Sequence, residues 1–343
     1  MKAAILRAGA MVVEELPDLT PGPGQVQVEP IACGICGSDL HTVVHSHDLV
    51  ASAKAAGMSV FDYNPDQDLV MGHELSVRVT GLGEGVSSIA EGDEFTAMPY
   101  LRTPAGRVYP GYSNIYPGGY SSQMLLSPGG LLPIPNGLDP ALAALTEPMA
   151  VGLHAVEESS IELGRAALVV GAGPVGLAVI AALSASGIEP IIAADFSPTR
   201  RGVAAAMGAH QVIDPAIESI FDAWAAATDR STPPVVFDAV GVPGMIDQLM
   251  QSAPTRSEIL VVGLCIPPDN FHPSFGVYKQ LSLKFVLGWS PEEFATSLHN
   301  LAEGNIDGST LVTGEVGIDG VPQAFADLAD PEQHVKILVR PNL

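Results

Sequence analysis

The sequence contains few cysteines and no long hydrophobic segment. Its three cysteines are a small, odd number, which excludes a disulfide-stapled fold and suits a reducing compartment. No apolar run reaches the roughly 18 residues that a membrane-spanning helix needs, and the first residues lack the features of a signal peptide. We therefore expect a cytoplasmic protein without a membrane anchor.

Positive charge is also scarce. The chain has 15 Lys and Arg against 38 Asp and Glu, which gives a formal net charge of −23. Nucleic acids and anionic membranes attract basic surfaces, so we expect neither as a partner. Hydrophobic residues make up 47% of the 343 positions, enough to form the cores of two domains.

The pattern of apolar and turn-forming residues divides the chain into three regions. Short β-type runs at 25–30 and 75–80, separated by Gly and Pro, indicate an irregular β-barrel-like domain at 1–150. Strands and helices then alternate over 151–288, which indicates an α/β domain with a doubly wound parallel sheet. The last region, 289–343, contains a helix and a closing strand. We expect strands at 166–170, 190–194, 211–213, 234–238, 259–263, 283–287 and 335–339, and helices at 174–186, 198–207, 218–227 and 291–303.

A glycine-rich motif separates the first strand of the α/β region from its first helix. Gly171 permits a tight turn, Gly173 lets the backbone approach a pyrophosphate, and Gly176 allows the helix to pack closely on the strand. The amino terminus of the helix would then face the negative charge. The motif and its position predict a dinucleotide site.

An acidic residue indicates which dinucleotide the site prefers. Asp195 follows the next strand, where its carboxylate can bind the ribose hydroxyls and would repel a 2′-phosphate. This position favours NAD. Arg200 and Arg201 leave NADP open, because a guanidinium can accommodate a phosphate.

Sulfur, imidazole and carboxylate side chains concentrate in two short segments. Cys33, Cys36 and His41 lie in the first segment, and His73 and Glu74 lie in the second. Such ligands from separate loops suit a catalytic zinc ion, which takes three protein ligands and keeps a fourth position open. A structural zinc site would need a second cysteine pair, which the sequence does not have.

These motifs together resemble the zinc-containing medium-chain dehydrogenases, a family that includes alcohol, polyol, butanediol and threonine dehydrogenases. The resemblance extends over the whole chain. It implies a GroES-like catalytic domain at 1–150, a Rossmann domain at 151–288 and a return to the catalytic domain at 289–343. The stretches that carry it are Cys33 to His41, Gly72-His73-Glu74, Gly118-Gly119-Tyr120, Glu147-Pro148 and the glycine motif.

The resemblance implies one catalytic zinc ion per chain. Cys36, His73 and Glu147 match the ligand positions of the family, and Glu74 matches an acid that can approach the metal. Whether Glu147 or Glu74 binds zinc in the resting state stays open. No cysteine lies between residues 93 and 123, where many relatives bind a second, structural zinc, so we expect that ion to be missing.

The resemblance also implies a proton relay and an acid beside the zinc histidine. Asp39 matches the acid that orients the zinc histidine. Ser38 matches the hydroxyl at the substrate oxygen, and the proton passes from it through the nicotinamide ribose to His41 and the solvent. The sequence shows no second hydroxyl beside Ser38.

A further set of residues matches the cofactor contacts of the family. Lys336 occupies a position from which a basic residue often reaches the pyrophosphate. The residues placed against NAD are Gly173, Pro174, Val175, Asp195, Arg200, Val240, Val262 and Leu264.

Two features depart from the family pattern. The segment without the structural-zinc cysteines contains Tyr100, Tyr109, Tyr112, Tyr116 and Tyr120. These tyrosines either pack the segment in place of a metal or line the substrate site or a subunit interface. The second feature is the long segment 42–69 that separates the relay from Gly72-His73-Glu74, in which we expect a short helix at 49–58 and two solvated histidines, His45 and His47.

The sequence therefore predicts an enzyme that transfers a hydride between NAD(H) and an alcohol or ketone. A secondary alcohol, diol or polyol fits Glu147 best, and the family forms homodimers and homotetramers. Two alternatives stay open at this point. One is a metal-free quinone or enoyl reductase with the same fold, and the other is a nucleotide-binding protein without catalytic activity.

Overall fold

We describe a computed structural model of the chain at residues 1–135 and 137–343. It divides into two compact units, Met1–Glu147 with Val312–Leu343, and Pro148–Leu311. The return to the first unit thus falls at Val312, later than the expected position 289. The reason is that α9 (Pro291–Ala302) belongs to the second unit, where Glu293 lies 3.0 Å from Nδ1 of His154 in α3 (Thr146–Glu157).

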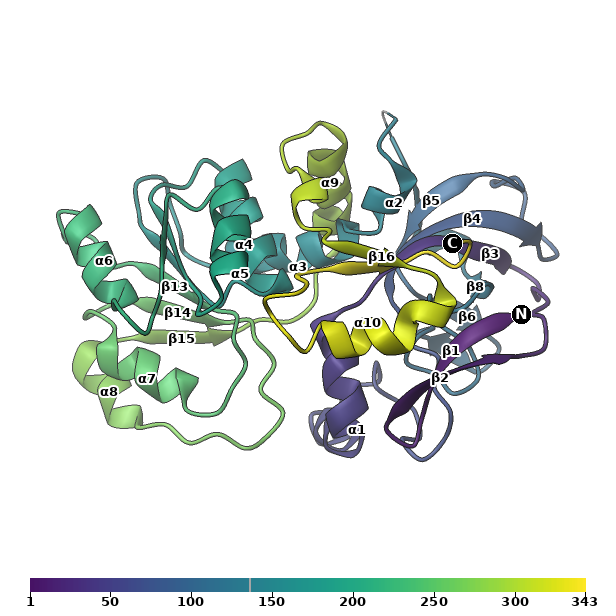
Figure 1. Cartoon of the computed structure of the whole chain (residues 1–343), viewed down its shortest axis with the longest axis horizontal. Coiled ribbons are helices and arrows are strands. Elements are labelled where there is room, and N and C mark those ends of the chain that lie inside the picture. The colour runs from purple at the N-terminus through teal and green to yellow at the C-terminus, as the bar shows by residue number, and fades with distance from the viewer. Residues whose placement is uncertain (136) are drawn as a thin grey trace. The chain divides into compact units, whose positions relative to one another are not determined.

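The first unit is built on a seven-stranded sheet (Figure 1). Its centre is the long antiparallel pair β3 and β4, whose register is shifted at two points. Two separate hairpins complete the β structure, β1 (Lys2–Arg7) with β2 (Ala10–Glu15), and β6 (Leu101–Thr103) with β7 (Gly106–Val108). The sheet order is β16 (Gly314–Val316), β17 (Ile337–Val339), β3 (Val26–Gly34), β4 (Glu74–Leu82), β5 (Glu94–Ala97) and β9 (Leu131–Pro133), with β8 (Met124–Leu126) paired to β3.

A single long helix lies where we expected a short helix at 49–58. Helix α1 (Gly37–Ala55) starts directly after Cys36 and continues through the expected segment, with non-helical backbone angles at His45. Only Asp39, Thr42, Leu49 and Ala53 of this helix are buried. The buried residues come from both halves of the helix, so α1 packs one narrow face against the rest of the unit along its length. This unit also contains the α-helices α2 (Pro140–Ala143) and α10 (Val321–Asp327).

The second unit contains a six-stranded parallel sheet. Its order is β12 (Gln211–Ile213), β11 (Ile191–Ala194), β10 (Ala167–Val170), β13 (Val235–Asp238), β14 (Glu258–Val261) and β15 (Ser282–Phe285). Strand order reverses between β10 and β13, where Val170 pairs with Ala194 on one side and Asp238 on the other. This doubly wound arrangement confirms the fold class expected from the alternating pattern, and its reversal point is where such sheets bind ligands.

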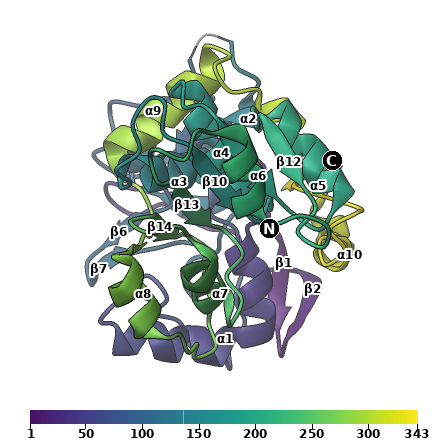
Figure 2. The same ribbon diagram turned by 90° about the vertical axis from the view of Figure 1, so that its left-hand side faces the viewer.

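Helices cover both faces of this sheet. The nearly apolar α4 (Pro174–Ala185) packs against β10, β11 and β13. Ile220 and Trp224 of α6 (Ile220–Ala227) and Leu249 of α7 (Met245–Ser252) share a core with strand residues. Figure 2 shows α4 on one side of β13 and β14, and α7 and α8 (Pro273–Lys279) on the other. Helix α5 (Pro198–Ala206) packs on β12.

None of the helices in the described part of the chain has both the length and the apolar character needed to cross a bilayer.

Candidate active site

The carboxylate of Asp39 is the centre of a buried hydrogen-bond network in the first unit. Asp39 lies in the first turn of α1 and is fully buried. Its Oδ2 accepts hydrogen bonds from the backbone N–H of Cys36 (3.0 Å) and the hydroxyl of Tyr120 (2.5 Å). Its Oδ1 lies 3.5 Å from Nδ1 of His73. One carboxylate thus contacts both the backbone of Cys36 and the imidazole of His73, as expected of an acid that orients a metal-binding histidine.

The three predicted zinc ligands come from different elements. Cys36 precedes α1, His73 precedes β4, and Glu147 lies in the first turn of α3. His73 and Glu147 are buried, and Cys36 is half-buried. Tyr112, Asp39 and then a side-chain hydrogen bond with Cys36 raise the pKa of His73 against the effect of burial, which places the Cys36 thiol beside the imidazole.

The donor chemistry of these residues suits zinc, which binds thiolate, imidazole and carboxylate. Within residues 1–135 and 137–343, however, no three His, Cys, Asp or Glu side chains form a group that could hold a metal. The ligand set therefore stays a prediction. Burial alone would lower the pKa of His73, but Tyr112, Asp39 and Cys36 outweigh it and the pKa is raised. A metal at His73 would thus compete with a proton.

Cys33 differs from Cys36 in its surroundings. Its side chain is fully buried, and burial, with the charge of Asp39 adding to it, raises the pKa of the thiol. A Cβ atom at Gly72 or Gly119 would lie 2.9 or 2.6 Å from its sulfur. Cys33 is therefore packed as a protonated, small core residue.

Glu74 forms a fully buried ion pair with Lys336. The Lys336 ammonium lies 2.6 Å from Oε1 and 2.5 Å from Oε2 of Glu74, and it donates to the carbonyl of Ile35 at 3.1 Å. Burial alone would lower the pKa of Lys336, but Glu74 raises it and the amine stays charged. A Cβ at Gly34 would lie 1.8 Å from Oε2 of Glu74, so a larger residue there would have to displace the carboxylate.

This ion pair bears on the expected role of Lys336. The ammonium is engaged with Glu74 inside the first unit and is not exposed at its surface. Contact between Lys336 and a pyrophosphate stays a prediction. No local pattern in the sequence indicated the pairing, because the two residues are 262 positions apart.

A second hydroxyl lies beside Ser38, which corrects the expectation that none is present. The Oη of Tyr112 is 3.1 Å from Oγ of Ser38, and it is 3.2 Å from Nδ1 and 3.4 Å from Nε2 of His73. Burial raises the pKa of the Tyr112 phenol, although His73 opposes this. His41 lies one turn beyond Ser38 on α1, and burial and the neighbouring His45 lower its pKa.

The tyrosines of the cysteine-free segment therefore serve different purposes. Tyr112 and Tyr120 hydrogen-bond to predicted site residues, whereas Tyr100 lies under the guanidinium of Arg107 at 4.8 Å. The Gly118-Gly119-Tyr120 motif was the sequence signal for Tyr120. Tyr112 had no such signal, because its contacts depend on the path of the segment through space.

The glycine motif of the second unit has the geometry expected of a phosphate-binding turn. Gly171 adopts a φ of +89°, and a Cβ at Gly176 would lie 1.9 Å from the carbonyl oxygen of Gly171. A Cβ at Gly173 would meet only Nη1 of Arg200, at 4.0 Å. The middle glycine thus borders free space next to a guanidinium, and Pro174 and Val175 begin α4 directly after it.

The acid and the two arginines next to this turn have separate partners. Asp195 accepts hydrogen bonds from the backbone N–H groups of Ala172 (2.7 Å) and Ser197 (2.8 Å). Arg201 donates to the carbonyl of Asp195. Nε of Arg200 is buried and has no hydrogen-bond partner among the described residues. An unpaired buried donor beside Gly173 fits a site for a phosphate group.

The remaining predicted cofactor residues lie at the carboxyl ends of parallel strands. Val240 follows β13, and its N–H donates to Oδ1 of Asp238, the last residue of that strand. Val262 follows β14, and Leu264 lies two residues further and is exposed. Because β10, β11, β13 and β14 are parallel, these residues share one sheet edge with the glycine turn and Asp195. This is the edge at which doubly wound sheets bind nucleotides.

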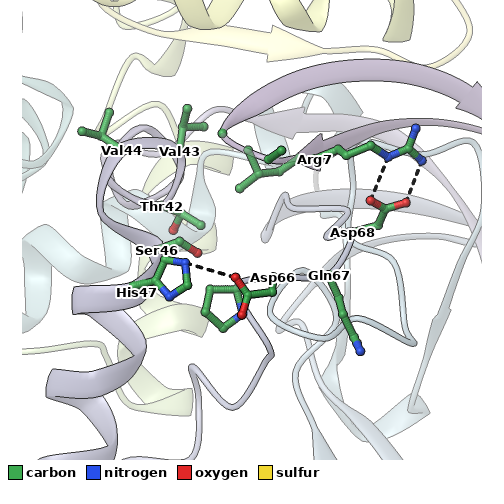
Figure 3. Close-up of a pocket in the computed structure, with 13 residues that line it drawn as sticks. Arg7, Thr42, Val43, Val44, Ser46, His47, Asp66, Gln67 and Asp68 are labelled. Carbon is green, nitrogen blue, oxygen red and sulfur yellow. Dashed lines mark hydrogen bonds and ion pairs between the residues drawn. The ribbon is translucent and has the colours of Figure 1, made fainter.

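A separate surface cavity of about 390 Å³ lies beside α1 in the first unit (Figure 3). It is lined by residues 6–9 at the end of β1, by residues 42–44, 46 and 47 of α1, and by residues 65–68, and it contains none of the predicted site residues. Its charged groups are already paired, Arg7 with Glu14 and Asp68, and His47 with Asp66. We therefore assign it no role in the reaction.

Known proteins resemble this chain in both units. Residues 22–136 match the family model of the alcohol dehydrogenase GroES-like domain, and residues 174–303 match that of the zinc-binding dehydrogenases. The (R,R)-butanediol dehydrogenase of Bacillus subtilis is 31% identical, with 96% of each chain covered. The sorbitol dehydrogenase of Halalkalibacterium halodurans is 27% identical, with 97% of this chain and 96% of the relative covered.

Solved structures agree with the sequence matches. The crystal structure of 2R,3R-butanediol dehydrogenase from Bacillus subtilis superimposes with a TM-score of 0.84 at 30% identity, covering 99% of both chains. One family accounts for the two domain matches, the full-length relatives and this superposition. The chain belongs to the zinc-containing medium-chain dehydrogenase family and is an oxidoreductase of the alcohol dehydrogenase class.

Proposed function

We propose that this protein oxidises a secondary alcohol or a vicinal diol with NAD, and reduces the corresponding ketone with NADH. We further propose that one zinc ion per chain binds to Cys36, His73 and Glu147. The observation that carries the proposal is the Asp39 network, in which one buried carboxylate contacts the backbone of Cys36 and the ring of His73. The relatives named as butanediol and sorbitol dehydrogenases support the substrate class.

The residues of the first unit would have separate roles in the reaction. When bound, zinc supplies a Lewis acid that makes the substrate hydroxyl more acidic, and NAD supplies the hydride acceptor. Asp39 keeps the His73 ring in one orientation, and Tyr120 keeps Asp39 in place. Ser38 accepts the hydroxyl proton, and His41 passes it to solvent. The low pKa of His41 keeps its imidazole neutral, and therefore able to accept a proton, at neutral pH.

In the second unit, we propose that Asp195 binds the adenosine ribose and that Arg200 binds the pyrophosphate. The position of Asp195 after β11 supports a preference for NAD, since its carboxylate would repel a 2′-phosphate. Arg201 is held by the Asp195 carbonyl and by Asp214 at 3.3 Å, so it is not available as a phosphate ligand in this arrangement.

We also propose that the protein is a cytoplasmic homo-oligomer. The strand β15 is the last in the order of its sheet, and most of its residues are exposed. Phe285 is 63% exposed and Leu287 is 65% exposed. The unpaired backbone groups of an edge strand are a template for pairing with a second chain, and Phe285 adds an exposed apolar side chain, so we place the subunit contact there.

The experiment that tests the proposed activity is a screen of NAD reduction with primary, secondary, cyclic and vicinal-diol substrates. We expect turnover with secondary alcohols and vicinal diols, and a lower kcat/KM with primary alcohols. If no alcohol reduces NAD but quinones or enones oxidise NADPH, the metal-free reductase hypothesis replaces this one. Nucleotide binding without turnover on any substrate would support the non-catalytic alternative.

A further inference from the structure

We propose that Tyr112 is a substrate-binding residue that selects molecules with two neighbouring oxygen atoms, such as vicinal diols and α-hydroxyketones. This inference rests on the proposed function and adds a residue to it. Its basis is the position of the Tyr112 hydroxyl, 3.1 Å from Oγ of Ser38 and 3.2 Å from Nδ1 of His73. A phenol oxygen thus lies next to the serine that acts on the reacting oxygen.

The position of Tyr112 is fixed by the backbone. Gly111 has a φ of +93°, and a Cβ there would lie 2.8 Å from the carbonyl oxygen of Gly72. Only a glycine allows this close approach. Because Gly111 precedes Tyr112 and Gly72 precedes His73, the contact between the glycines places the phenol beside the imidazole.

Packing also holds the ring of Tyr112. It meets Phe61 edge-on, with ring centroids 4.8 Å apart, and lies 5.1 Å from the ring of His73. The residue is 8% exposed, so its hydroxyl cannot turn outward to solvent without breaking this packing. A rigid aromatic residue with one polar atom is well suited to hold a ligand in a single orientation.

When metal and substrate are bound, the hydroxyl of Tyr112 has few hydrogen-bond partners within the protein. In the proposed function, His73 commits one nitrogen to the metal and faces Asp39 with the other, and Ser38 engages the reacting oxygen of the substrate. The oxygens of Ser38 and Tyr112 are about as far apart as two gauche oxygens on adjacent carbon atoms. Tyr112 can therefore donate to the second oxygen while Ser38 accepts from the first.

The same geometry disfavours a simple alcohol. A methyl or methylene group would then occupy the place of the second oxygen and leave a buried hydroxyl without a partner. A site built to hydrogen-bond a substrate oxygen discriminates against analogues that lack it. If Tyr112 served only to support Ser38 or His73, its removal would instead affect every substrate equally.

The test compares Tyr112→Phe with the wild type on 2,3-butanediol and 2-butanol. We expect kcat/KM for the diol to fall about tenfold more than kcat/KM for the mono-alcohol, as the loss of one buried hydrogen bond predicts. Tyr116→Phe is the matched control, because it lies in the same segment and the structure gives its hydroxyl no bond to Ser38 or His73. It should leave the diol-to-alcohol ratio at the wild-type value. Equal losses on both substrates, or no loss on either, would overturn the proposal.

A binding measurement separates this inference from the proposed activity. The thermal shift that 2,3-butanediol causes in the zinc-loaded protein with NAD should be larger for the wild type than for Tyr112→Phe. If the shift differs in this way but no alcohol reduces NAD, the activity is wrong while Tyr112 still binds the diol. Equal shifts in both proteins, or no shift in either, would contradict the role of Tyr112.

Discussion

Ser38 and His41 have separable roles in proton transfer, and single substitutions can distinguish them. Ser38→Ala should lower kcat for alcohol oxidation by about 100-fold at every pH, a typical loss for a group that transfers a proton. We do not expect the neighbouring Tyr112 to take over, because its hydroxyl lies 3.1 Å from Oγ of Ser38 and is proposed to bind the second oxygen of the substrate. Measuring kcat across pH for the wild type and the variant checks this expectation.

His41→Gln should cost less than Ser38→Ala, and its effect should depend on pH. Burial and His45 lower the pKa of His41. The neutral imidazole, which can accept a proton, therefore persists to a lower pH than in an ordinary histidine. The deficit of the variant should be greatest near and below neutral pH, where hydroxide is scarce, and added imidazole should restore part of it. Equal, pH-independent losses in both variants, without rescue, would mean that the proton leaves by another route.

Asp195 should determine the choice of dinucleotide. Asp195→Ser removes the carboxylate that would repel a 2′-phosphate, so the ratio of kcat/KM for NAD to that for NADP should fall by about tenfold or more. Steady-state kinetics with both cofactors on one preparation provides an internal control. A wild-type enzyme that prefers NADP would show instead that Arg200 dominates the site.

Several site residues could be predicted from the sequence, and others could not. Asp39 and Cys36 lie within one short motif, so their relation is local and visible in the sequence. The contacts of Tyr112 with Ser38 and of Lys336 with Glu74 join distant segments, and no local pattern reports them. Tyr120 could be predicted in part, since its motif is recognisable in the sequence but its hydrogen bond to Asp39 is not.

At the scale of elements, β15 is the strand whose surface predicts an assembly. Phe285→Lys replaces the exposed phenyl ring of this edge strand with a charge and should shift the protein toward monomers, because a buried unpaired charge is costly at an interface. Light scattering coupled to size exclusion, run over a range of concentrations, measures this shift. Ile115→Lys is the control, since Ile115 is 77% exposed but lies in the first unit. A wild type that is monomeric at all concentrations would refute the role of β15.

The elements themselves were predicted best where their pattern was strong. The strands β10 to β15 and the helix α4 lie within a few residues of their expected positions, because buried parallel strands and apolar helices have distinct sequences. Helices α7 and α8 were not expected, since they are short and lie between glycine- and proline-rich segments. Residues 37–55 form one long helix in place of a short one, and two of its polar residues, Asp39 and Thr42, are buried.

At the scale of the whole molecule, the chain leaves the first unit and later returns to it. The order β17, β3, β4 brings the end of the chain into the sheet that carries His73 and Glu74. This return is why Lys336 can pair with Glu74. The sequence indicated the return, but its position depended on the packing of α9 in the second unit, which local pattern does not report.

The central claim is that Cys36, His73 and Glu147 hold one catalytic zinc ion in each chain. Metal analysis of the purified protein, with activity measured on the same samples, tests it most directly. We predict about one zinc per chain in the wild type and in the control Cys33→Ala, and loss of both zinc and activity in Cys36→Ser. Two zinc ions per chain, full activity after chelation, or zinc retained by Cys36→Ser would contradict the account.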